Sequence, residues 1–161
     1  MFARTFLIGA LLVSAGFTAA AAPSTNDPAA PSDGAVAVRS AYPMAETIER
    51  LRQDIAGKGL TFFAAIEQSK LAGDAGVELR PSTLLVFGNP ALGAQFISSN
   101  PVAGLDWPVR LLVFQDEGGA VWTAYTDFQW IEHRHHIKDR DAAFGKASEV
   151  IASITSSVRA R

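Results

Sequence analysis

Residues 109–126 read VRLLVFQDEGGAVWTAYT, two apolar runs joined by a short acidic and glycine-rich segment. Runs of branched and aromatic residues around such a segment are typical of a β-hairpin. We therefore expect strands at 109–115 and 120–126, with Asp116 and Glu117 as turn carboxylates. A hairpin implies antiparallel pairing, which regular alternation of strands and helices does not produce. This stretch thus predicts an α+β fold.

The segments around the hairpin complete the predicted fold. Further strands are expected at 35–38, 60–66 and 83–87, and helices at 43–56, 90–99 and 141–158. In the last of these helices, Phe144, Ile151 and Ile154 recur with the period of a helix lying on a sheet. The predicted order is β-α-β-β-α-β-β-α, with the helices packed on a mainly antiparallel sheet.

The N-terminus has the parts of a secretory signal peptide. Arg4 supplies a positive charge, residues 6–17 are mostly apolar, and small residues suited to cleavage follow. The apolar stretch is about 12 residues long, short of the roughly 20 that span a bilayer. We therefore predict a signal peptide over residues 1 to about 22 (1–22), cleaved after Ala21, a flexible linker over 23–34 and a single domain over 35–161.

Composition narrows the function classes. Without the predicted signal peptide the chain has 13 basic and 16 acidic side chains, a net charge of −3. This mild charge gives no reason to expect nucleic acid or an anionic membrane surface as a partner. The chain has no cysteine, which removes thiol chemistry, thiolate metal sites and lipidation at cysteine. No nucleophile or phosphate-loop motif is present, so no catalytic residue is predicted.

Four segments resemble a known family, and they are residues 47–51, 84–90, 105–113 and 116–125. Their sequences, which include LLVFGNP and LDWPVRLLV, are similar to the domain of unknown function 302 family, and the likeness covers roughly residues 36–158. The resemblance implies a TATA-binding-protein-like fold and a periplasmic or secreted location, and it implies no activity. Two positions depart from the family pattern: Gln68 replaces a common histidine, and Trp107 stands where Leu is usual.

Three isolated residues are candidates for ligand binding. Asn89 suits the N-cap of a helix whose first residue is Pro90, and capping alone accounts for both residues. The amides of that helix end could instead receive an anionic group. Asp106 is interpreted as a turn residue, with a buried acid of raised pKa as the alternative. Trp130 lies outside the predicted strands and is a candidate for lining a groove.

All three histidines lie in residues 132–136, EHRHH. His133 and His136 would share one face of a helix, whereas His133 and His135 would share one face of a strand. Either pair could contribute to a zinc or copper site, but no distant ligand or His-Glu-x-x-His pattern accompanies them. A polar loop leading into the last helix is the simpler interpretation, and no cofactor is predicted. His135 is a further candidate ligand-binding residue, because the Arg134-His135 pair resembles a family feature.

These observations favour an exported, non-catalytic module that binds a small molecule or a partner protein. A homodimer through the sheet or the last helix is one candidate assembly, and no membrane contact is expected after signal cleavage. Two alternatives stay open. One is a metal-binding protein that uses His133, His135 and His136, and the other is an enzyme of unknown reaction.

Overall fold

The computed structural model describes residues 34–160. The predicted signal peptide and all of the predicted linker except Gly34 lie outside this range, so the structure does not test them. In the part of the chain that is described, no helix has the length and apolar character needed to cross a membrane.

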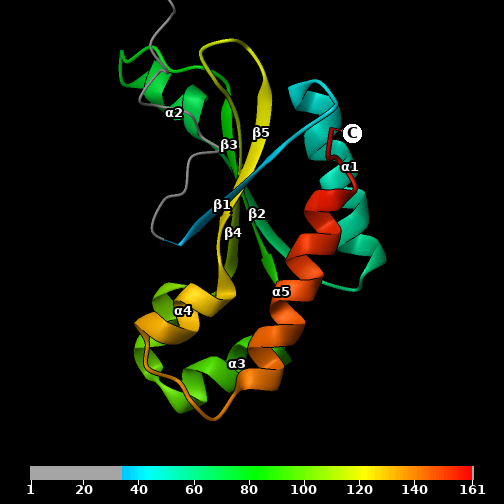
Figure 1. Ribbon diagram of the computed structural model, residues 1–161. Coiled ribbons are helices and arrows are strands. Elements are labelled where there is room, and N and C mark those ends of the chain that lie inside the picture. The colour runs from blue at the N-terminus through cyan, green and yellow to red at the C-terminus, as the bar shows by residue number, and fades with distance from the viewer. Residues whose placement is uncertain (1–33, 161) are drawn as a thin grey trace, which may run out of the picture.

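The described chain folds into a five-stranded sheet accompanied by helices (Figure 1). The strands are β1 (Ala35–Arg39), β2 (Thr61–Glu67), β3 (Ser82–Gly88), β4 (Val109–Gln115) and β5 (Val121–Thr126). The helices are α1 (Met44–Gly57), α2 (Gln68–Asp74), α3 (Pro90–Ser99), α4 (Phe128–Arg134) and α5 (Asp141–Ser156), with a 3-10 helix η1 (Pro101–Leu105) after α3.

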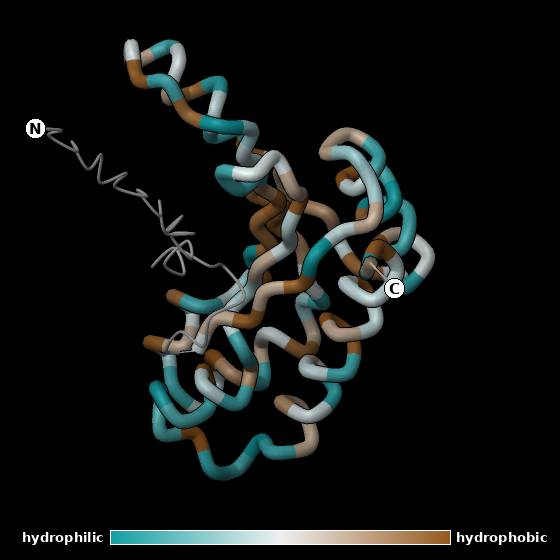
Figure 2. Tube along the Cα trace, turned by 45° about the horizontal axis from the view of Figure 1, so that its top comes forward, coloured by the Kyte–Doolittle hydropathy of each residue, from teal (hydrophilic) through white to brown (hydrophobic). Residues whose placement is uncertain are grey.

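The sheet has the order β1-β5-β4-β3-β2, and every neighbouring pair is antiparallel. The predicted α+β class is therefore confirmed. The predicted hairpin is the β4–β5 pair, in which Leu112 lies opposite Ala124. Its turn is closed by Asp116, whose Oδ1 accepts a hydrogen bond from the amide of Ala120 at 2.8 Å. Hydrophobic residues are concentrated along the strands in the middle of the molecule (Figure 2).

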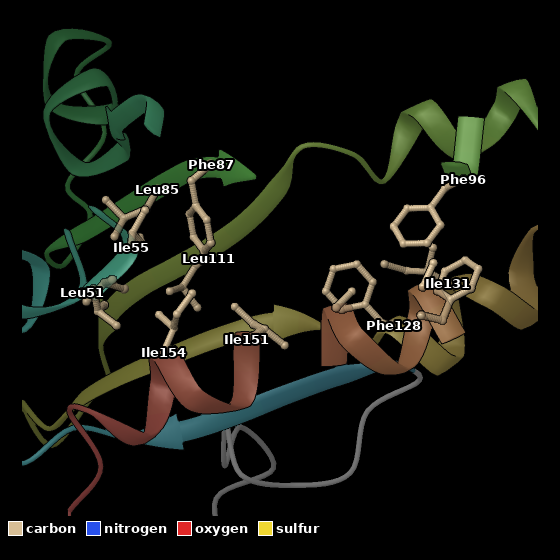
Figure 3. Close-up of a cluster of buried hydrophobic side chains, with 14 of the residues drawn as sticks. Leu51, Ile55, Leu85, Phe87, Phe96, Leu111, Phe128, Ile131, Ile151 and Ile154 are labelled. Atoms are coloured by element: carbon tan, nitrogen blue, oxygen red, sulfur yellow. The ribbon is translucent and has the colours of Figure 1, made fainter. Parts of the chain in front are cut away.

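Helices α1 and α5 lie together on one side of the sheet (Figure 1). Leu51 and Ile55 of α1, and Ile151 and Ile154 of α5, belong to the same buried cluster as three residues of the sheet, which are Leu85, Phe87 and Leu111 (Figure 3). Alternate residues of a strand point to opposite faces, so this cluster uses one face of β3 and β4.

The core continues beyond the sheet, between α3, α4 and the start of α5. Phe96 of α3 stacks on Phe144 of α5 with ring centroids 4.2 Å apart, and Phe128 of α4 lies 6.2 Å from Phe96. Figure 3 shows Phe96, Phe128 and Ile131 grouped at this end. The aromatic group joins the short helices to the long helix and forms the floor of the site described below.

The three short helices α2, η1 and α4 were not predicted. The segment 132–136, interpreted as a polar loop, instead begins inside α4. That helix starts at Asp127, whose side chain accepts a hydrogen bond from the amide of Gln129 at 3.0 Å, and it buries Phe128 and Ile131. A helix of seven residues spans only two turns, too few for an apolar period to stand out in the sequence.

Candidate functional site

A cavity of about 190 Å³ opens where β3 ends and β4 begins, under α3 and α5. Its position follows from local sequence, because β3 stops at Gly88 and Asn89 caps α3 directly afterwards. Asn89 Oδ1 accepts a hydrogen bond from the amide of Leu92 at 3.2 Å, and Pro90 is the first helical residue. The predicted capping role of Asn89 is therefore confirmed, and the same residue lies at the cavity.

The wall of the cavity is almost entirely apolar. The sheet, α3, α4 and α5 contribute side chains to it, among them Leu60, Phe87, Phe96, Val109, Phe128 and Ile151. Apolar pockets with a few polar groups at the edge are the usual form of small-molecule sites.

Trp107 forms one side of the cavity and lies against α3. A Cβ placed on Gly93 would overlap the indole ring, so α3 approaches Trp107 only because residue 93 is glycine. Phe63 of β2 contacts the indole edge-on, with centroids 6.0 Å apart. Trp107 thus packs between β2 and α3 while it lines the cavity.

Each polar side chain that lines the cavity can donate a hydrogen bond to a ligand. Lys58 and Lys146 carry only N–H groups, and the Trp107 indole has one N–H. The Oδ1 of Asn89 accepts the hydrogen bond of the helix cap, and its NH₂ group can donate to a ligand. The lysines form exposed ion pairs on their own helices, Lys58 with Asp54 at 2.9 Å and Lys146 with Glu149 at 3.5 Å. Such pairs are weak and can be exchanged for a bound group.

Beside the cavity, Asp106 forms the centre of a charged cluster. Its Oδ2 lies 2.6 Å from Nε2 of His135 and 3.1 Å from Nη1 of Arg134, and its Oδ1 lies 2.9 Å from Nη2 of Arg110. Asp106 and His135 are buried, whereas both arginines are about half exposed.

The interpretation of Asp106 as a simple turn residue is wrong. Its amide does close η1 by bonding the carbonyl of Ala103 at 3.0 Å, but its carboxylate faces cationic side chains instead of its own backbone. A buried carboxylate needs such partners, since leaving an ion unpaired away from water costs several kcal/mol. Arg134 and His135 come from the end of α4, and Arg110 comes from β4. The sequence around Asp106 does not show that these side chains meet it.

The cluster fixes one wall of the cavity in place. Asp106 immediately precedes Trp107, while His135 and Arg134 stand at the end of α4, whose first residue Phe128 lines the cavity. Asn100 adds a further link, because its Nδ2 donates to the carbonyl of His135 at 2.9 Å. The contact between Asp106 and His135 therefore connects the segment before Trp107 to the end of α4.

The three histidines do not converge. His135 is buried against Asp106, His133 Nδ1 lies 3.0 Å from the carbonyl of Gln129, and His136 has a φ of 52°. Glu132, whose pKa is raised by burial and by the Asp141 carboxylate, lines a shallow depression with His133 and His136. Across residues 34–160, no three His, Asp or Glu side chains could hold a metal ion together. A zinc or copper site was the alternative left open by the sequence, and it stays an alternative.

Trp130 lies outside the cavity. Its indole packs so closely on Gly34 that a Cβ there would overlap the ring, and the guanidinium of Arg134 lies 5.2 Å from the ring centroid. Of the four candidate residues, the structure thus brings Asp106 and His135 together, places Asn89 at the cavity and leaves Trp130 beyond the charged cluster.

Several site residues escaped the sequence reasoning. Lys58, Trp107 and Lys146 come from separate segments with no shared motif, and no local pattern links Asp106 to Arg110 and Arg134. One signal was available: a glycine inside the α3 helix costs about 1 kcal/mol relative to alanine, so it indicates a close packing partner.

Two curated relatives that this chain matches are longer than the chain itself. A fluoride-specific ion channel, FluC 1 of Brucella suis, is 36% identical over 104 residues, which is 65% of this chain and 41% of the channel. FluC 1 of Brucella abortus is also 36% identical over 104 residues, which is 65% of this chain and 38% of that channel. The chain therefore spans about two fifths of the curated relatives that it matches.

A crystal structure of an uncharacterized conserved protein DUF302 from Bacillus stearothermophilus has the same fold. It superposes with a TM-score of 0.72 at 19% identity, and the match covers 80% of this chain and 100% of that one. Residues 36–158 match the domain of unknown function DUF302, the range over which the sequence resembled it. This chain belongs to the DUF302 family.

Proposed function

We propose that this chain is a small-ligand-binding module whose ligand combines a compact apolar body with a carboxylate or similar acceptor group. The apolar cavity beside Trp107, where each polar side chain of the lining carries a hydrogen-bond donor, is the observation that carries the proposal. The sequence features of a signal peptide support a site of action outside the cytoplasm.

The size of the cavity sets the size of the apolar body. Its volume of about 190 Å³ slightly exceeds the roughly 150 Å³ of an engineered apolar cavity that binds benzene. One aromatic ring or a short alkyl chain therefore fits. Burying roughly 150 Å² of apolar surface contributes about 4 kcal/mol, which corresponds to a dissociation constant near 1 mM without any polar contact.

The donors at the cavity select the polar group of the ligand. Lys58 and Lys146 approach from α1 and α5, and Asn89 approaches from the start of α3. An anionic acceptor would receive charge-assisted hydrogen bonds there, which are stronger than neutral ones. A cationic ligand would meet two ammonium groups, so the cavity favours an anion.

Benzoate and the neutral benzyl alcohol are the two probes that test this proposal. Each is titrated to 10 mM against the ¹⁵N-labelled protein, and the indole N–H signal of Trp107 is followed by NMR, about tenfold above the expected dissociation constant. We expect saturable shifts at Trp107 with both probes and tighter binding of benzoate. If neither probe moves signals of the cavity residues, the proposal is wrong.

Matched variants separate the two parts of the site. Val150→Trp fills the cavity and should abolish binding of both probes, whereas the control Val102→Trp changes an exposed residue away from it. Lys146→Gln should weaken benzoate about three- to tenfold and leave benzyl alcohol unchanged. The control Lys70→Gln removes a lysine with a comparable exposed ion pair and should alter neither.

Sodium fluoride is a necessary third probe, because the Brucella relatives are fluoride-specific channels. Fluoride carries no apolar body and gains nothing from the wall of the cavity. We expect it to leave the Trp107 signal unchanged at the concentrations that saturate benzoate binding. Saturable fluoride shifts that survive Val150→Trp would replace the present proposal with a halide site.

A further inference from the structure

We infer that Trp107 is the specificity-determining residue of the proposed site, and that its indole limits the apolar body of the ligand to one ring or a short chain. This role of Trp107 rests on the proposed function of the cavity and names the side chain that would make it selective. The main chain packed against the indole, a bulge in β2 and the anchored backbone beside the ring support it.

Two glycines bring the main chain against the indole. Gly88 ends β3, and a Cβ placed on it would lie 3.1 Å from Nε1 of Trp107. A Cβ on Gly93 of α3 would overlap the same edge of the ring. Packed main chain has little freedom to shift, so the indole has no room to move towards α3 or the end of β3. A larger ligand therefore cannot enlarge the cavity by pushing the ring in that direction.

A bulge in β2 supports the indole from another element. The register of β2 against β3 shifts between Phe62 and Ala64, so Phe63 is an extra residue in this strand. Bulges often redirect a side chain beside a functional site. Here Phe63 meets the Trp107 ring edge-on, with centroids 6.0 Å apart and an angle of 77° between the rings. The edge-to-face arrangement is a preferred aromatic geometry, and it adds a contact from β2 to those from β3 and α3.

The backbone is anchored on both sides of the indole. Before it, the carboxylate of Asp106 lies 2.6 Å from Nε2 of His135. After it, Val109 begins β4 and pairs with the end of β3. Only Pro108 separates Val109 from the indole residue, and proline has a fixed φ. The segment that carries the ring is therefore held by long-range contacts and does not have the freedom of an open loop.

The cavity leaves no space for a second ring behind this fixed wall. Its volume of about 190 Å³ is only about 40 Å³ more than that of the engineered cavity of roughly 150 Å³ that binds benzene. A carboxylate bound by Lys58, Lys146 or Asn89 fixes the polar end of the ligand. A ligand with two fused rings would have to give up these contacts or leave one ring in water.

The order of affinities distinguishes a size limit from an open apolar groove. In an open groove 2-naphthoate should bind more tightly than benzoate, because it buries more apolar surface. A cavity limited by Trp107 should show the opposite order. We expect benzoate to bind at least about tenfold more tightly than 2-naphthoate, the scale on which apolar pockets discriminate by size.

Titration of the ¹⁵N-labelled full chain with benzoate and 2-naphthoate tests the inference. The side-chain NH₂ of Asn89 and the amide of Leu92 serve as NMR reporters, since both are present in every variant. Trp107→Leu replaces the bicyclic indole by an isobutyl group and should reverse the order, so that 2-naphthoate becomes the tighter ligand. The control Trp122→Leu makes the same change in β5, outside the cavity, and should keep the wild-type order.

Phe63→Ala tests the support of the indole without changing the lining of the cavity. It removes the contact from β2 and leaves every donor in place, so the preference for benzoate should fall by about threefold or more while benzoate affinity changes little. Circular dichroism verifies that the variants fold. If Trp107→Leu does not fold, Trp107→Phe keeps one ring at this position and should narrow the preference in the same direction.

Each way of failing has a separate signature. Wild-type protein that binds 2-naphthoate at least as tightly as benzoate would overturn the role of Trp107 and leave the proposed function standing. An unchanged preference in a folded Trp107→Leu or Trp107→Phe variant would do the same. Wild-type protein that does not bind benzoate would overturn the proposed function, and the role of Trp107 with it.

Discussion

At the scale of single residues, Asp106 connects more of the molecule than any motif in the sequence suggested. Its buried carboxylate joins η1, β4 and the end of α4 through Arg110, Arg134 and His135. The two arginines are about half exposed, so water screens part of their attraction. The contact with the buried His135 is not screened in this way, and it holds the segment before Trp107 against α4.

Removing the charge of Asp106 should loosen this connection. Asp106→Asn leaves two guanidinium groups without their carboxylate, and we expect the free energy of unfolding to fall by about 2–3 kcal/mol. Urea denaturation measures the change. Asp74→Asn is the matched control, because it breaks an exposed pair with Lys70 and should cost at most about 0.5 kcal/mol. Equal effects of the two variants would contradict the role given to Asp106.

Gly93 should be intolerant of even one methyl group. In Gly93→Ala the new Cβ overlaps the Trp107 indole, so the ring must move and the variant should lose about 1–3 kcal/mol of stability. Gly145→Ala makes the same change in α5, where no atom lies within 4 Å of the new Cβ. That control should gain up to about 1 kcal/mol from better helix propensity. Thermal unfolding and the NMR signal of the Trp107 indole measure both effects.

The carboxyl of Asp116 should titrate below its usual range. A hydrogen bond from the Trp122 indole, 2.7 Å long, lowers the pKa of Asp116, and backbone amides of the turn lower it further. Its ionised form therefore stabilises the hairpin above the ordinary value of 3.8, and this contribution is lost as the pH falls through the lowered pKa. Trp122→Phe should raise the pKa of Asp116 towards that value in a ¹³C NMR titration. Asp139, whose pKa is lowered mainly by Ser99, should titrate as before.

At the scale of elements, the helix ends decide where the site lies. Asn89 follows β3 and caps α3, and the same residue lines the cavity. The position of the helix cap therefore also sets the edge of the cavity. α4 is short, yet its Asp127 cap and two buried side chains hold it against the aromatic group formed by α3 and α5. Hydrophobic packing stabilises such short helices more than their intrinsic propensity does.

Two substitutions at Asn89 distinguish capping from ligand binding. Asn89→Ala removes the cap and should cost about 1 kcal/mol of stability, whereas Asn89→Asp keeps an acceptor for the amide of Leu92 and should cost little. Asp has lost the NH₂ donor and adds a negative charge, so it should weaken benzoate binding while leaving stability nearly unchanged. Chemical denaturation and the benzoate titration together check this. A stable Asn89→Asp variant with wild-type benzoate affinity would show that Asn89 is a cap alone.

At the scale of the whole molecule, the proposed ligand site lies where the sheet meets the helices. The cavity lies between the sheet and the helices that contribute to the aromatic group, so residues far apart in the sequence must pack together before the site exists.

Export is a prediction about the whole chain. Expressed in a bacterial host with its own N-terminus, the protein should be recovered from outside the cytoplasm and begin at Ala22, because cleavage after Ala21 follows the small residues of the signal. Intact mass spectrometry of the purified protein measures the start directly. A product that retains residues 1–21 in the cytoplasmic fraction would contradict the signal peptide.

The sequence alone determined those features that depend on neighbours along the chain. The antiparallel hairpin follows from the turn at Asp116, the start of α3 follows from Asn89 and Pro90, and the α+β class follows from the order of apolar runs. Each is set by local hydrogen bonding and by the period of a helix or strand, which a sequence displays directly.

Only the tertiary structure decided what lies at the site. Asp106 meets His135 across 29 positions of the chain, and Gly93 meets Trp107 across a helix end, through contacts that no local pattern records. The cavity exists because segments between Lys58 and Ile151 pack around one space. The sequence next to a residue is the same whether or not its side chain lines that space, so the sequence does not identify the lining. Local interactions therefore determined the elements, and long-range packing determined the site.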